Sequence, residues 1–379
     1  MSGRRILISC YFPRSVELEG VGSLVRGFAQ AFVRAGWAVT LLLPRGEYRI
    51  PGVSVATYES GLLGLSRYRR AVRKHSASAD VTLLVENNPA LGASADCTVD
   101  AARTRVLFYS PLQSFSLVRE MGWSKQALVH AVGKHWFWAR RVDWRDKRCV
   151  VGSEFQAGQL RSLGCGQVDV LPASGVSREA TVLSRPAARR SLGWDDQPVV
   201  GYLGHYSRAK GVDVLLKAFD TYTSLSAGAG VLALAYSGKG ALVSAGRSAL
   251  ERLRSRGRVR ELGVCDPLDF LAACDVVALP YITSSIFHQP QVMLESLAAS
   301  TSVITTSLGG FAELPSQGPC GLVIPARDAD ALTTAVAQSL ADLPALHAMG
   351  QRGRAVFEAS CPCERVVEYM SDVARVSRP

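Results

Sequence analysis

The sequence lacks long apolar runs and segments of low complexity. A membrane-spanning helix needs roughly 18 uncharged residues in a row, and no stretch of this 379-residue chain approaches that. The apolar run Ile6–Tyr11 ends at Pro13, too short for the core of an export signal. With 48% hydrophobic and 20% charged residues, we expect a globular chain with enough material for two domains.

Cysteine patterns typical of metal sites or disulfide frameworks are also missing. The nine cysteines are scattered, and the only close pair is Cys361 and Cys363, which lacks the spacing and the partners of a zinc site. We therefore expect nine reduced thiols in a cytoplasmic protein.

Acidic residues are in deficit, and they do not form catalytic or metal-binding patterns. The chain has 43 Lys and Arg against 32 Asp and Glu, a net charge of +11, which favours an anionic partner such as nucleic acid, a membrane surface or a phosphorylated small molecule. Asp328-Ala329-Asp330 follows Pro325 and predicts a helix N-terminus and not a metal site. No Asp-x-Asp follows a predicted strand, where it could carry a metal, and no pair of carboxylates suggests hydrolysis.

Short apolar segments alternate with helical patterns along the whole chain. The run Ile6–Tyr11, a helical pattern from Leu24 to Gly36 and the run Ala38–Pro44 predict a strand-helix-strand unit, the building block of doubly wound parallel sheets. Further strands are predicted at Val81–Val85, Val106–Tyr109, Cys149–Gly152, Val168–Leu171, Pro198–Gly204, Val231–Tyr236, Val259–Leu262, Asp275–Pro280 and Ser302–Thr306.

A polar segment divides the two series of strands. Ser177–Gln197 is the best candidate for a linker, so the pattern predicts an α/β protein of two Rossmann-like doubly wound domains facing across a cleft. The expected domains are residues 1–180 and 181–362, and residues 363–379 are expected to form a terminal helix, about Cys363–Val376.

One loop combines glycines and cations at a predicted strand end. Gly204–Gly211 follows a strand and precedes a helical pattern, and a helix N-terminus with a fixed cation suits a diphosphate. The loop resembles that of retaining glycosyltransferases of family 4 (glycosyl transferases group 1, GT-B fold), in which Gly-Arg-Leu ends a strand and Lys-Gly opens a helix. The resemblance places Lys210 on the phosphates. His205 occupies the family's arginine position, and Arg208 is a candidate to supply the guanidinium.

The family has two glutamates separated by seven residues, and this sequence has a glutamate at one of the two positions. Glu295 matches the second, which the resemblance makes the partner of the ribose hydroxyls, because a carboxylate accepts two hydrogen bonds. The first is replaced by Phe287, either a core aromatic or part of the donor pocket. His288 and Gln289 are candidates for sugar contacts from the same loop.

Further motifs fit the same family. Tyr236–Gly240 resembles its Gly-x-Gly turn and implicates Gly238, and Glu261–Val264 lies where the backbone, at Gly263 and Val264, reads the base. Leu308–Leu314 and Gly321–Val323 match its Gly-Gly-x-x-Glu and Gly-Leu-Val patterns.

In the first domain the match is looser. Gly20 and Gly22 lie where the family places a glycine pair beneath the donor phosphates, although an ordinary turn stays open. The family's mid-domain histidine is absent. Ser110 and Gln113, with Asn87 after the preceding strand, are the acceptor-side candidates.

The resemblance implies a retaining hexosyltransferase that uses a nucleotide-activated sugar, with UDP ahead of GDP, and a small-molecule or lipid-linked acceptor. It makes residues 1–180 the acceptor-side domain and residues 181–362 the nucleotide-sugar domain, with the terminal helix returning to the first domain. It also implies that neither a metal nor a cofactor is needed, because the nucleotide-sugar is a substrate. The missing glutamate and arginine leave two alternatives open. One is an atypical donor such as a deoxy or amino sugar or a phosphorylated pentose, as in antibiotic biosynthesis, and the other is a nucleotide-binding protein that has lost catalysis.

Two basic stretches bear on partners. Arg67–Arg70 with Arg73 and Lys74, and the aromatic-rich Trp136–Arg148, are compatible with weak association with an anionic membrane, but we favour half-buried helices with charged outer faces for both. No nucleic-acid-binding module is recognisable, so we expect no nucleic-acid partner.

Overall fold

The computed structural model describes residues 3–11, 21–60, 63–86, 100–109, 143–225, 230–236, 242–283 and 290–377. Contacts within the chain divide it into two compact units. The N-terminal unit contains the residues up to Arg178 and those from Ser360 onward, and the C-terminal unit contains the described residues from Glu179 to Ala359.

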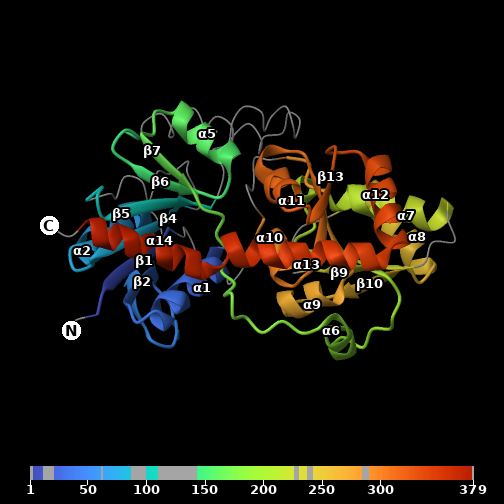
Figure 1. Ribbon diagram of the computed structural model, residues 1–379, viewed down its shortest axis with the longest axis horizontal. Coiled ribbons are helices and arrows are strands. Elements are labelled where there is room, and N and C mark those ends of the chain that lie inside the picture. Colours follow the sequence, from blue (N-terminus) through green and yellow to red (C-terminus); the bar gives the residue numbers. More distant parts are fainter. Residues whose placement is uncertain are drawn as a thin grey trace. The chain divides into compact units, whose positions relative to one another are not determined.

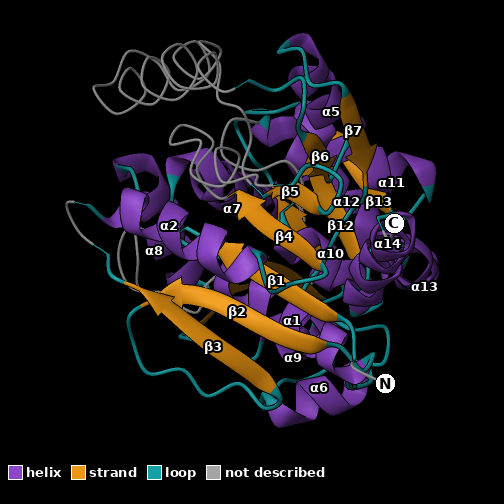
Figure 2. Ribbon diagram, turned by 90° about the vertical axis from the view of Figure 1, so that its left-hand side faces the viewer, coloured by secondary structure: helices purple, strands orange, loops and turns teal. Residues whose placement is uncertain are grey.

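The N-terminal unit is built on a parallel sheet of seven strands, with the order β3-β2-β1-β4-β5-β6-β7 in its described part (Figure 2). Its central strands are buried on both faces, as their continuous apolar runs require. The strands are β1 (Arg5–Cys10), β2 (Ala38–Pro44), β3 (Val53–Tyr58), β4 (Val81–Glu86), β5 (Thr104–Phe108), β6 (Arg148–Val151) and β7 (Gln167–Val170).

The helices described in this unit are α1 (Val21–Arg34), α2 (Gly64–Ser76), α5 (Glu154–Ser162) and α14 (Cys363–Val376). α14, from the far end of the chain, packs beside α1, and the two share one apolar core (Figure 1). At its first turn the Glu364 carboxylate accepts hydrogen bonds from the Ser177 hydroxyl (2.5 Å) and from the Arg178 main-chain N–H (2.9 Å). These contacts hold the start of α14 against the residues that lead out of this unit.

The C-terminal unit has a second parallel sheet, of six strands in the order β10-β9-β8-β11-β12-β13. Its strands are β8 (Val199–Leu203), β9 (Val231–Ala235), β10 (Val259–Leu262), β11 (Val276–Leu279), β12 (Ser302–Thr306) and β13 (Gly321–Ile324). The strand order reverses between β8 and β11. In doubly wound sheets, ligands bind beyond the carboxyl ends of the strands at such a reversal.

Helices and short turns connect these strands. They are α6 (Arg185–Ser191), η4 (Arg208–Lys210), α7 (Val212–Leu225), α8 (Ser244–Ser255), α9 (Pro267–Ala273), α10 (Gln291–Ala298), η5 (Gly309–Ala312), α11 (Glu313–Gln317), α12 (Ala329–Ala341) and α13 (Leu343–Ser360). The predicted helix start at Asp328 is confirmed, because its side chain caps α12 by accepting the Ala331 N–H at 2.8 Å.

The predicted strands and the terminal helix are found with ends that shift by at most a few residues, and the predicted parallel α/β class is confirmed. Two strands, β3 and β13, were not predicted. The interpretation of Ser177–Gln197 as linker is wrong for Arg185–Ser191, which forms α6. Two polar side chains of α6 explain why this segment is not a linker, because they bind a buried carboxylate.

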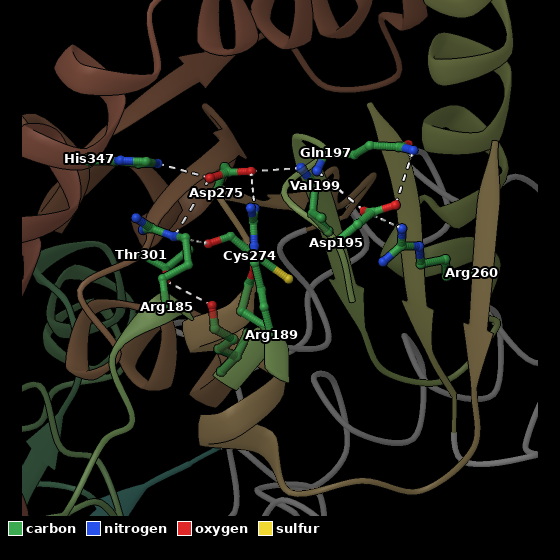
Figure 3. A network of polar contacts seen from close by, with 12 residues as sticks. Arg185, Arg189, Asp195, Gln197, Val199, Arg260, Cys274, Asp275, Thr301 and His347 are labelled. Atoms are coloured by element: carbon green, nitrogen blue, oxygen red, sulfur yellow. Dashed lines mark hydrogen bonds and ion pairs between the residues drawn. The ribbon is translucent and has the colours of Figure 1, made fainter. Parts of the chain in front are cut away.

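That carboxylate is Asp275, which is 1% exposed and directly precedes β11 (Figure 3). It accepts hydrogen bonds from Arg189 of α6 and from the Val199 N–H that begins β8, both at 2.7 Å. His347 of α13 lies 2.9 Å from its other oxygen, and Arg185 lies 3.6 Å away. One buried charge thus joins α6, α13 and two neighbouring strands at the amino ends of the strands.

We expect Asp275→Ala to lower the free energy of unfolding of the C-terminal unit by about 3–5 kcal/mol, because it leaves the buried Arg189 without its charged partner. Asp195→Ala is the matched control. Asp195 pairs with Arg260 at 2.6 Å, but its side chain is 53% exposed to water, so its loss should lower the free energy of unfolding much less. Urea unfolding of both variants measures the difference, and equal effects would contradict the importance of the buried carboxylate.

Candidate active site at the carboxyl ends of the C-terminal strands

Lys210 is held close to the carboxyl end of β8. The strand ends at Leu203, Gly204 follows with a φ of +148°, and the turn η4 is capped by the Ser207 side chain, which accepts the Lys210 N–H at 3.3 Å. The Lys210 side chain folds back over Gly204, where an added Cβ would lie 2.6 Å from Nζ. Glycine at position 204 therefore leaves the space that the ammonium group occupies.

The residue after Lys210 ties this loop to the neighbouring strand. Gly211 has a φ of +71°, and a Cβ there would lie 1.8 Å from the carbonyl oxygen of Pro280, which follows β11. The Ile282 N–H donates to the Ala209 carbonyl at 3.0 Å. The loop is therefore fixed against the end of β11, at the reversal of strand order where ligands bind in such sheets.

The other two basic candidates on this loop differ in exposure. Arg208 is exposed, whereas His205 and Lys210 are half-buried. The main chain of His205 is fixed, because its carbonyl accepts the Tyr202 hydroxyl at 2.6 Å. The positive charge of Arg208 is therefore open to water, whereas that of Lys210 is partly covered.

Glu295 lies on α10, in the second turn after Pro290. Burial, together with the negative charge of Asp266, raises the pKa of its carboxyl group to about 7, although the Lys210 ammonium acts to lower it. The structure therefore brings Glu295 and Lys210, far apart in sequence, within electrostatic reach of each other.

The ends of β9 and β10 form the next part of this edge. The rings of Tyr206 and Tyr236 stack with centroids 3.9 Å apart and 12° between their planes. The Tyr236 N–H donates to the Leu262 carbonyl at 3.2 Å, which joins the two strand ends. Beyond β10, Gly263 faces open space and Val264 is 89% exposed, so the backbone there is accessible.

Asp213, in the first turn of α7, was not singled out from the sequence. Its Oδ1 accepts the Val243 N–H at 3.1 Å, and a Cβ on Gly246 would lie 2.0 Å from the same oxygen. Asp213 therefore fixes the start of α8 relative to the loop of Lys210. Burial raises the pKa of this carboxyl group, while Val243 and Arg208 lower it. The only signal in the sequence is an acidic residue in the first turn of a helix.

The structure describes only some of the other candidate residues. Gly20, Asn87, Ser110, Gln113, Gly238, Phe287, His288 and Gln289 lie outside the described residues. Gly22 is buried in the first turn of α1, in the N-terminal unit. The described candidates of the C-terminal unit share one edge of its sheet: Gly204, His205, Arg208, Lys210, Gly263, Val264 and Glu295.

In the described ranges, no three His, Cys, Asp or Glu side chains group in a way that suits a metal ion. No described helix is both long and apolar enough to cross a membrane. On α2, the basic residues Arg67, Arg70, Arg73 and Lys74 are exposed, and its Tyr68 and Val72 are buried.

Two doubly wound parallel sheets, with a cationic loop at the strand reversal of the second, define an α/β protein of two Rossmann-like units. Residues 197–342 match the family described as glycosyl transferases group 1. The match covers 146 of the 379 residues, so the C-terminal part of the chain carries the glycosyltransferase domain of this family, and the chain has the GT-B fold.

Known relatives and solved structures agree. The GDP-mannose-dependent alpha-(1-6)-phosphatidylinositol monomannoside mannosyltransferase of Mycobacterium tuberculosis is 26% identical over 75% of this chain and 74% of its own. D-inositol 3-phosphate glycosyltransferase of Corynebacterium urealyticum is 31% identical over 41% of this chain and 38% of its own. The fold is that of sucrose-phosphate synthase from Thermosynechococcus elongatus, with a TM-score of 0.75, 20% identity and 98% of both chains covered.

We expect Gly211→Ala to unfold at a temperature several degrees lower than the wild type, because its Cβ would collide with the Pro280 carbonyl and alanine disfavours a φ of +71°. Gly263→Ala is the control, since no atom lies within 4 Å of its added Cβ. Calorimetry without nucleotide measures both, and an unchanged transition in Gly211→Ala would contradict the close approach.

Proposed function

We propose that the protein is a retaining hexosyltransferase that moves a sugar from a nucleoside diphosphate to a hydroxyl group of a polyol or lipid-linked acceptor. The observation that carries this proposal is the placement of Lys210 and Glu295 together at the strand reversal of the C-terminal sheet. A cation there suits a diphosphate, and a carboxylate suits the ribose hydroxyls.

The chemistry assigned to these residues is electrostatic. As the glycosidic bond breaks, negative charge grows on the departing phosphate, and Lys210 and Arg208, assisted by His205, stabilise it. Glu295 accepts hydrogen bonds from the ribose, and the accessible backbone at Gly263 and Val264 reads the base. In the proposed retaining reaction, the departing phosphate oxygen takes the proton of the acceptor hydroxyl on the same face of the sugar, and neither metal nor cofactor takes part.

The other candidates complete this assignment. Gly20, Gly22 and Gly238 allow close approach of the phosphates, and Gly204 leaves room for the Lys210 ammonium that binds them. Phe287, His288 and Gln289 serve the donor sugar. Asn87, Ser110 and Gln113 serve the acceptor. Weak association with anionic membranes, through the exposed arginines of α2, stays a prediction.

The names of the relatives guide the choice of substrates. The Mycobacterium tuberculosis relative is named for GDP-mannose and for a phosphatidylinositol mannoside, and the Corynebacterium urealyticum relative for an inositol phosphate. We therefore rank GDP ahead of UDP, reversing the order expected from the sequence, and propose an inositol-like polyol as the acceptor group. An atypical donor and a nucleotide-binding protein without catalysis stay as alternatives, because Phe287 and His205 replace the family's glutamate and arginine.

We expect one nucleotide among GDP, UDP, ADP, TDP and phosphoribosyl pyrophosphate to raise the melting temperature of the wild type selectively, because a ligand that binds only the folded state stabilises it. Lys210→Ala should lose this effect. Lys217→Ala removes an exposed lysine of α7 and should retain it. Stabilisation that survives in Lys210→Ala would contradict the assignment of Lys210, and no stabilisation by any compound would contradict nucleotide binding itself.

The titration of Glu295 should change the stability of the free protein and its affinity for the nucleotide in opposite directions. Because the pKa of Glu295 is raised to about 7, its protonated form stabilises the ligand-free fold. This contribution is complete at a pH below the usual pKa of a carboxyl group, and it is lost as the pH rises through about 7. Ribose binding instead needs the carboxylate. We expect the nucleotide Kd to rise about tenfold from pH 8 to pH 6.

The matched variant for this experiment is Glu295→Gln, which keeps the size of the side chain and removes its titration. Calorimetric titration of both proteins at each pH cancels the ionisation of the nucleotide's own phosphate groups. The same pH dependence in both proteins would show that Glu295 does not titrate on binding.

A further inference from the structure

Arg327 has a backbone conformation that arginine disfavours. Among the described residues, only Ser300 and Arg327 combine a side chain with a positive φ, of 58° and 66°. Ser300 follows Ala299, the C-cap of α10, a usual place for a left-handed residue. Arg327 does not follow a helix, so helix capping does not explain its conformation.

A second local preference is also broken at Arg327. It directly precedes Asp328, the N-cap of α12, and so places a cation at the positive end of a helix dipole. Neither feature helps the turn to form. Residues that break local rules in this way concentrate at functional sites, where a ligand compensates for them.

The guanidinium group of Arg327 points to the main chain beside the loop of Lys210. Its Nη2 donates to the Ile282 carbonyl at 3.4 Å, and the Ile282 N–H donates to Ala209, which lies between Arg208 and Lys210. Ile282 also faces Gly211, since its Cγ2 would lie 3.4 Å from a Cβ there. One residue, Ile282, therefore touches both Arg327 and the phosphate loop.

Most of the hydrogen-bonding capacity of this guanidinium is free for a ligand. Arginine has five N–H donors, and in the part of the chain that the structure describes the Ile282 carbonyl is the one acceptor found for Arg327. Its side chain is exposed. A second ligand-facing arginine on this edge would add a planar fork that binds phosphate oxygens in pairs.

We propose that Arg327 is a further binding residue of the donor site, which contacts the diphosphate of the nucleotide-sugar together with Lys210 and Arg208. The proposal rests on the proposed function. A charge-assisted hydrogen bond to a phosphate oxygen offsets the unfavourable backbone conformation when the donor is bound.

The test uses Arg327→Asn, because asparagine tolerates a positive φ and carries no charge. We expect its melting temperature without nucleotide to stay the same or rise by about one to three degrees. Its Kd for GDP or UDP, whichever the wild type binds, should rise about tenfold, while binding of the parent nucleoside stays unchanged. Arg327→Lys, which keeps the charge, should recover part of the affinity.

Ser300→Asn is the matched control, since it changes a residue with a similar φ at the opposite end of the strands and should leave the Kd unchanged. An unchanged Kd in Arg327→Asn overturns the proposal. So does a lower melting temperature without nucleotide, because Arg327 would then hold the Ile282 main chain as a structural residue. Absence of nucleoside diphosphate binding by the wild type overturns the proposed function as well, and that result is distinct from a failure confined to Arg327.

Discussion

The close approach of Gly211 to the carbonyl of Pro280 is the constraint on which the site depends. Because the chain turns at Gly211 with a positive φ and lies against the end of β11, the preceding residue, Lys210, is held over the end of β8. The hydrogen bond from the Ile282 N–H to the Ala209 carbonyl joins the same two segments a second time. A cation in a fixed position, and not one on a free loop, is what diphosphate binding requires.

Charged side chains differ in burial and in pairing between the two ends of the C-terminal sheet. At the amino ends of the strands, Asp275 is buried and its oxygens are bound by Arg189, Val199 and His347, so the charge is neutralised inside the protein. At the carboxyl ends, Lys210 and Glu295 are only half-buried, and burial keeps the pKa of Glu295 near 7. The first arrangement encloses its charge within the scaffold, whereas the second holds a cation and a titratable carboxyl group at the candidate site.

The strands that the sequence predicted are mostly buried on both faces, where apolar runs are continuous. β3 was missed because it is an edge strand with one buried residue, and its pattern is correspondingly weak. α6 was taken as linker because Arg185 and Arg189 are polar, and their partner, Asp275, lies far along the chain. Local patterns do not contain such long-range pairs.

The sequence by itself determined the parallel α/β class, because that class follows from local apolar patterns, and it singled out Lys210 and Glu295 as candidates through the resemblance to a known family. Only the tertiary structure decided that Glu295 lies near Lys210 and that Arg327 reaches Ile282. The physical reason is the strand order: β11 pairs with β8 although β9 and β10 come between them in the chain. Side chains at the carboxyl ends become neighbours only once that order is set.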